Sequence, residues 1–265
     1  MNIFKLELRM HAKATVIWTL ALLVLVAGFA FGFPIISKNV AAMNSILQMM
    51  PEGLKKSLGI NVIDMSTPIG VFGFMFMYIT LVGAVQAMTL GLSVLSVELR
   101  DKTADFLLSK PVRRSTIVHA KLAAALVCLL ITNLVFLVVV RVALDILSTA
   151  PYSFSIFLSL VLSVLFIQLF FLSLGALISV FLNKMKTVIP LALGVVFGFF
   201  IVNLLNESLK GRPLTLFSPF SYFSTGSIFG NNGFAMVWLV LNTLLVAAFT
   251  AGTYIRYLRK DVPSV

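Results

Sequence analysis

Charged residues are scarce in this chain of 265 residues: they make up 11% of it, and only 9 of them are acidic. A soluble domain of this length needs a polar surface, which a composition that is 60% hydrophobic cannot supply. Uncharged stretches of 24 to 43 residues are long enough to cross a bilayer as helices, and they lack the alternating pattern of a membrane barrel. The sequence therefore predicts an all-α integral membrane protein.

Sequence signals for catalysis and metal binding are missing as well. The phosphate-binding pattern G-x-x-x-x-G-K-[ST] does not occur, and no apolar run holds the paired carboxylates that ion-coupled carriers often use. The single cysteine, Cys128, cannot form an internal disulfide, and the two histidines, His11 and His119, lack metal-ligand spacing. We therefore expect no enzymatic activity and no catalytic, cofactor-binding or metal-binding residues in this chain.

What the chain does have is apolar segments of membrane-spanning length. Two uncharged runs are too long for one helix, so we expect a tight turn at 148–152 and a re-entrant or outer hairpin at 213–232. The interval 38–68 is polar and is predicted to be an outer loop. The six predicted spans of a single transmembrane domain, 1–265, cover residues 14–37, 69–97, 116–147, 153–182, 187–206 and 233–257.

The N-terminal 13 residues are amphipathic, with Lys5, Arg9 and Lys13 on one helical stripe and apolar residues around it. This pattern is typical of a short helix that lies on the membrane surface. A secretory signal is the alternative, but the uncharged run of 24 residues that follows is longer than the usual apolar region of a signal. We favour a surface helix followed by an uncleaved first span.

Basic residues are distributed unevenly between the two sides of these spans. If the N-terminus is cytoplasmic, 14 of the 20 basic residues lie inside and six outside. The positive-inside rule therefore places both termini in the cytoplasm, since the number of spans is even. The formal net charge of +11 reflects this topology, so we expect no nucleic-acid partner. The absence of a cleaved leader suits a multi-pass protein of a bacterial plasma membrane.

The most informative segment is the charged cytoplasmic interval 98–115. Thr103 to Ser109 can form a short amphipathic helix with Phe106 and Leu107 on its apolar edge, and Pro111 would end it. Ser115 or Thr116 is then expected to cap the next helix. Such a helix suits docking onto a soluble partner, and an ordinary positive-inside loop is an equally good interpretation on physical grounds alone.

This interval resembles the cytoplasmic loop of type 2 ATP-binding-cassette (ABC) exporter permeases. The pattern is E-x-x-x-x-T-x-D-x-L-L-x-x-P-V-x-R-x-x-I-x-x-x-K, and Lys102 stands where the family often has glycine. The basic N-terminal helix, the six spans and the Pro-aromatic segment at 218–222 fit the same layout. The residues that carry the pattern are Glu98, Thr103, Asp105, Leu107, Leu108, Pro111, Val112, Arg114, Ile117 and Lys121.

The resemblance implies a coupling helix at about 99–110 that fits a groove in a separate ABC ATPase subunit. Two copies of this ATPase would bind ATP and Mg, and their closure would move the spans as rigid bodies. A second permease subunit, identical or related, and an outward direction of transport are also implied. Phe106, from the apolar edge, and Arg113, from the basic flank, complete the predicted ATPase-coupling residues.

The membrane interior offers weaker signals. Phe72, Phe76, Met77 and Gln86 of the second span could line a path for a hydrophobic or amphipathic substrate, and helix packing is the alternative. Buried amides and hydroxyls are expected to join helices, and two G-x-x-x-G pairs are candidate dimer contacts. An ion-gradient-driven transporter and a non-transporting membrane scaffold remain the alternative functions. The amides, hydroxyls and glycines concerned are Gln86, Thr89, Asn133, Gln168, Asn203, Asn242, Gly28, Gly32, Gly194 and Gly198.

Overall fold

The computed structural model describes residues 3–39, 45, 48–49, 55, 63–100, 113–149, 151–182, 187–208 and 212–259. Across these ranges the regular elements are all helical, and six helices are long and apolar enough to cross a membrane. The predicted all-α membrane protein with six spans is therefore confirmed. The six helices are α1 (Ile3–Lys38), α4 (Pro68–Arg100), α6 (Arg114–Leu147), α7 (Phe154–Phe181), α8 (Ile189–Ser208) and α11 (Met236–Arg259).

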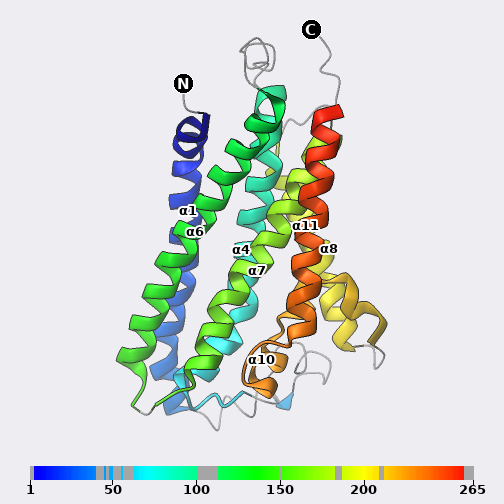
Figure 1. Ribbon diagram of the computed structural model, residues 1–265. Helices are drawn as coiled ribbons and strands as arrows, with labels where there is room; N and C mark the ends of the chain where they lie inside the picture. Colours follow the sequence, from blue (N-terminus) through cyan, green and yellow to red (C-terminus); the bar gives the residue numbers. More distant parts are fainter. Residues whose placement is uncertain are drawn as a thin grey trace.

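The helices form one bundle whose two ends carry different parts of the chain (Figure 1). Both termini lie at one end, together with the last turn of α4 and the first turn of α6. We call this the terminal end. The turn between α6 and α7 and the short helix α10 (Thr225–Asn231) lie at the opposite, distal end. The end of α4 and the start of α6 therefore lie at the same end of the bundle as the start of α1 and the end of α11.

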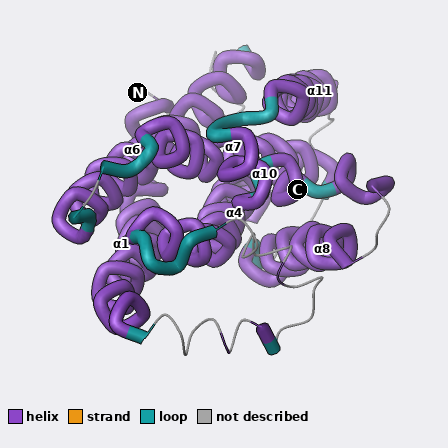
Figure 2. Tube along the Cα trace, turned by 90° about the horizontal axis from the view of Figure 1, so that it is seen from below, coloured by secondary structure: helices purple, strands orange, loops and turns teal. Residues whose placement is uncertain are grey.

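Helices α4 and α7 form the centre of the bundle. Viewed along the bundle, α1 and α6 lie on one side of this pair and α8 and α11 on the other (Figure 2). In both central helices 61% of the most apolar stretch is buried, against 11% in α11. The outer helices therefore present most of their apolar surface outward, as expected where lipid rather than water surrounds the protein.

Two glycines allow the central helices to approach each other closely. A Cβ atom added to Gly91 would lie 2.3 Å from the carbonyl oxygen of Leu172, and one added to Gly175 would lie 2.8 Å from that of Met88. Both distances are shorter than a van der Waals contact, so only glycine fits at this crossing. The sequence prediction had singled out other glycine pairs.

The N-terminal segment differs from the predicted surface helix because it continues into the first span as one helix, α1. Its residues contain no proline or glycine before Gly28, so nothing interrupts the helical hydrogen bonds at the predicted boundary. A helix of 36 residues is about 54 Å long, and the hydrocarbon core is about 30 Å thick. Helix α1 is therefore longer than a single perpendicular crossing of the hydrocarbon core requires.

The segment predicted as a hairpin, 213–232, forms three short helices: η2 (Arg212–Phe217), α9 (Pro219–Tyr222) and α10. Phe220, Tyr222 and Phe223 are buried, and the Tyr222 ring stacks on Trp238 of α11 at 5.4 Å between centroids. Asn232, in the left-handed region at φ 49°, ends α10 before α11 begins. The segment thus packs into the bundle, and its depth in the membrane stays a prediction.

Candidate functional site

Most of the predicted ATPase-coupling residues fall outside the part of the chain that the structure describes. Glu98 belongs to the last turn of α4, where the backbone alone is described. Arg113, Arg114 and Lys121 are described and lie at the start of α6. Docking of the segment 98–115 onto a partner therefore stays a prediction. The residues outside the described ranges are Thr103, Asp105, Phe106, Leu107, Leu108 and Pro111.

Helix α6 begins at Arg114, which is two residues before the start that a Ser115 cap would give and three before the start that a Thr116 cap would give. Arg113 is the N-cap residue, with extended backbone at φ −64° and ψ 137°, and its carbonyl accepts the Thr116 amide at 3.0 Å. The expectation that Ser115 or Thr116 caps the helix is wrong. Ile117 and Val118 are fully buried, so tertiary packing of the first turns sets the start of the helix in place of a side-chain cap. Arg113 itself is exposed at the terminal end.

Lys121 is fully buried two turns into α6, which places its charge inside the bundle rather than on a docking face. Its Nζ donates to Oε1 of Glu7 on α1 at 2.6 Å and to the carbonyl oxygen of Val94 on α4 at 2.8 Å. A buried ammonium group is costly unless an opposite charge and hydrogen bonds compensate it. Both are present here, and they come from two different helices.

Glu7 is a functional candidate that the sequence prediction missed. Among the described side chains it is the one buried carboxylate, and it also faces His11 one turn further along α1, with Oε2 3.5 Å from Nε2. The signal was present in the sequence: Glu7 is the one acidic residue among the first 13, and it falls on the opposite helix face from Lys5, Arg9 and Lys13. Its partner, 114 residues away, could be found only from the packing of α1 against α6.

The Glu7–Lys121–Val94 contacts form what we call the terminal clamp. They join α1, α4 and α6 close to the segment 98–115, which connects α4 to α6. Because both hydrogen bonds are buried, they fix the positions of these three helices relative to one another. One predicted coupling residue, Lys121, is therefore part of a contact that joins three helices.

A second set of polar contacts crosses the bundle between the two ends. Gln86 of α4 donates to the Thr132 hydroxyl of α6 at 3.0 Å, and Gln168 of α7 donates to Gln86 at 3.2 Å. The Thr19 hydroxyl of α1 lies 2.9 Å from that of Thr132, and Asn133 donates to Gln168. Four spans are joined by side-chain hydrogen bonds, as expected where no water competes for them.

Comparison with known protein families shows to which family this chain belongs. The family model described as ABC-2 family transporter protein matches residues 1–262. The chain is a member of the ABC-2 transporter family. The resemblance seen around residues 98–121 thus extends over nearly the whole length. No match is found among individual curated proteins.

The predicted substrate-path residues of this ABC-2 protein occupy helix-packing positions. Phe72 is fully buried and contacts the rings of Phe29 and Phe136 at 5.6 and 6.4 Å between centroids. Phe76 and Gln86 are also buried, and Met77 is half-buried. A path along these side chains would need α1, α4 and α6 to separate, so helix packing is the role that the geometry supports.

The glycine pairs predicted as dimer contacts are open on the surface of this ABC-2 subunit. A Cβ atom added to Gly28, Gly32, Gly194 or Gly198 would meet no other atom within 4 Å. These glycines are therefore not used in packing within the subunit, in contrast to Gly91. They stay available for contact with a second subunit, which is still a prediction.

Proposed function

We propose that this chain is the permease subunit of an ABC exporter that uses ATP hydrolysed by a separate ATPase. In this proposal two copies of the ATPase, each with ATP and Mg, dock on the segment 98–115. A second permease subunit, identical or related, completes the transporter. The protein would lie in a bacterial plasma membrane with both termini in the cytoplasm, and the proposed cargo is hydrophobic or amphipathic.

The observation that carries the proposal is membership in the ABC-2 family over residues 1–262. Two features of the fold support it. The helix ends that flank the interval, the last turn of α4 and the first turn of α6, lie at the same end as the start of α1 and the end of α11 (Figure 1). The terminal clamp joins the helices on both sides of this interval to α1. A partner that pushes on the interval would therefore move three helices at once.

The ion-gradient alternative finds less support. A carrier of that kind needs a group within the spans that can take up and release an ion. Among the described residues, the one buried carboxylate, Glu7, is already bound to Lys121 near the terminal end. The polar contacts in the bundle interior come from neutral amides and hydroxyls.

The first test is a pull-down of the tagged full-length chain from its native membrane in mild detergent. We expect a soluble ATPase to co-purify with the wild-type chain and to be lost when residues 98–114 are scrambled. The matched control scrambles 17 residues of the predicted outer loop, 40–56. Loss of the ATPase in both variants, or its absence from the wild-type sample, would count against the proposal.

The second test measures coupling in the reconstituted complex. Charge reversal of Arg113 and Arg114 is expected to lower transport per ATP hydrolysed, since these residues are placed at the start of α6. The control reverses Arg256, which lies in the last turn of α11 at the same end. Equal effects of the two changes would indicate a general role of positive charge at this end rather than a coupling site.

A further inference from the structure

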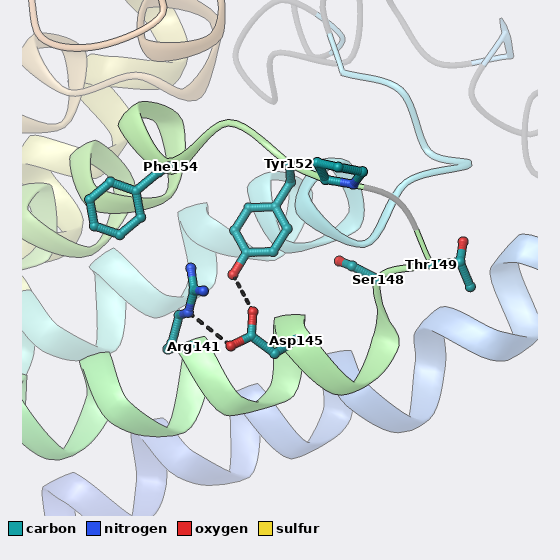
Figure 3. A pocket seen from close by; sticks show the side chains of 7 residues that line it. Arg141, Asp145, Ser148, Thr149, Tyr152 and Phe154 are labelled. Carbon is teal, nitrogen blue, oxygen red and sulfur yellow. Dashed lines mark hydrogen bonds and ion pairs between the residues drawn. The ribbon is translucent and has the colours of Figure 1, made fainter.

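The distal ends of α6 and α7 border an open cavity of about 480 Å³ that contains a paired positive and negative charge (Figure 3). Nε of Arg141 lies 2.9 Å from Oδ2 of Asp145, and the Tyr152 hydroxyl donates to Oδ1 at 2.9 Å. Both charged side chains are close to half exposed. The cavity is therefore open to a ligand and carries no net formal charge.

Aromatic rings hold the guanidinium group in place. Its central carbon lies 5.4 Å from the ring centre of Tyr152 and 5.9 Å from that of Phe154. Figure 3 shows Arg141 between these two rings, with Asp145 one turn further along α6. Cation–π contacts at these distances fix an arginine side chain that would otherwise be mobile. The site is thus preorganised rather than a loose surface pair.

Both charged groups have hydrogen-bonding capacity beyond these contacts. Arginine has five N–H donors, and the ion pair uses the one on Nε. A carboxylate has about four acceptor positions, of which Arg141 and Tyr152 occupy two. Burial, followed by the hydrogen bond to Asp145, raises the pKa of the Tyr152 phenol, so this hydroxyl stays a donor at neutral pH. The site can accept an anionic and a cationic group together.

A second, apolar crevice lies further along the same two helices, and its lining begins on α6 at Leu137, one turn before Arg141. Its volume is about 280 Å³, and its lining is apolar except for Asn133, whose amide Nδ2 is bound within the protein. Leu134 and Leu130 line the crevice and are 65% and 45% exposed, so it opens sideways. The other lining residues are Leu137, Val161, Leu162 and Leu165.

The distance between the charged cavity and the far end of the crevice matches one leaflet of a bilayer. Arg141 and Leu130 are 11 residues apart on one helix, which corresponds to about 16 Å. One leaflet contributes about 15 Å of hydrocarbon. A molecule with its headgroup at Arg141 and its chain at Leu130 would therefore span the same depth as a lipid of the distal leaflet.

We propose that the α6–α7 seam binds one zwitterionic phospholipid of the distal leaflet, with its phosphate on Arg141, its ammonium on Asp145 and an acyl chain in the crevice. The planar guanidinium group suits a phosphate, and Asp145 suits an amine while disfavouring a purely anionic headgroup. Tyr152, which contacts both charged groups, is one of the two residue types enriched at the level of lipid headgroups. This inference does not depend on the proposed transport function, because it concerns the single chain.

Native mass spectrometry of the purified full-length chain tests the proposal directly. Delipidated protein is incubated with phosphatidylethanolamine, with phosphatidylglycerol or with diacylglycerol, which lacks the phosphate. We expect wild type to retain phosphatidylethanolamine best and Arg141→Gln to reduce its occupancy about tenfold, since hydrogen bonds to charged groups are strong. The matched control is Arg256→Gln, because Arg256 lies 5.4 Å over the Phe181 ring but at the terminal end. Equal losses in the two variants would overturn the proposal.

A second variant tests the assignment of the two charges without removing the arginine. Asp145→Asn makes the site formally positive, so the preference should change from phosphatidylethanolamine to phosphatidylglycerol. An unchanged preference would overturn the placement of the ammonium group on Asp145. Glycerophosphoethanolamine, which has the headgroup without acyl chains, distinguishes a lipid from a free zwitterion. If it displaces the lipid at equal concentration, the crevice has no role and the phospholipid assignment is wrong.

Discussion

Helix α6 carries one ion pair at each end, and the two differ in almost everything except their charges. Near the terminal end, Lys121 pairs with Glu7 of another helix, and both side chains are almost completely buried. Near the distal end, Arg141 pairs with Asp145 of the same helix, and both are close to half exposed. The first pair fixes the relative position of helices, and the second presents charge to the surroundings of the protein.

The difference shows that burial and sequence separation decide what an ion pair can do. A pair four residues apart on one helix contributes little to tertiary structure, because both partners move together. A buried pair between residues 114 apart makes the position of one helix depend on the other. The terminal clamp is therefore suited to transmit motion, whereas the distal pair is suited to bind a ligand.

Breaking the terminal clamp should have the largest effect. Lys121→Met leaves Glu7 buried without its partner, and we expect the free energy of unfolding in detergent to fall by about 3–5 kcal/mol. The double variant Glu7→Leu, Lys121→Met should recover most of this loss, because no uncompensated charge remains. We expect it still to show less transport per ATP, which separates coupling from stability. Full coupling in the double variant would indicate that the clamp is only a packing feature.

The close contact between α4 and α7 near the terminal clamp should have the second-largest effect on stability. One turn before Val94, Gly91 contacts α7 so closely that an added methyl group would meet the Leu172 carbonyl at 2.3 Å. Gly91→Ala should therefore lower the free energy of unfolding by about 1–3 kcal/mol, the usual cost of overpacking. Thermal unfolding in detergent measures it. Gly194→Ala, which meets nothing within 4 Å, is the matched control and should leave the stability of the subunit unchanged.

The smallest effect is expected at the distal pair. Arg141→Gln removes a half-exposed ion pair and cation–π contacts, so the free energy of unfolding should change by about 1 kcal/mol or less. The same thermal unfolding assay gives the comparison with Lys121→Met. A loss as large as that of the clamp variant would mean that Arg141 is a structural residue, and the contrast between the two ends would disappear.

The spans and the distal ion pair could be predicted from the sequence, whereas the burial of Lys121 could not. The six spans followed from uncharged runs, since the thickness of a bilayer sets their length. The pair at Arg141 and Asp145 could be suggested from spacing, because residues four apart share a helix face. Lys121 was predicted as a coupling residue from its place in a motif, and its burial could not be foreseen.

The start of α6 and the close crossing of α4 and α7 were predicted wrongly or missed for the same physical reason, which is that tertiary packing decides both. The start of α6 was misplaced because the burial of Ile117 and Val118 outweighs the capping preference of Ser115. The close crossing of α4 and α7 was missed because Gly91 and Gly175 lie on different helices and form no G-x-x-x-G pattern. Each depends on contacts between segments far apart in the chain.

The sequence by itself determined the membrane class, the number of spans and the resemblance to ABC-2 permeases, because these depend on local hydropathy, charge and a contiguous motif. Tertiary structure alone decided that Glu7 meets Lys121, that α4 and α7 are central, and that a charged cavity and an apolar crevice follow one seam. These features arise where helices cross, and the helical period does not specify which helices become neighbours. The packing of the bundle makes that choice.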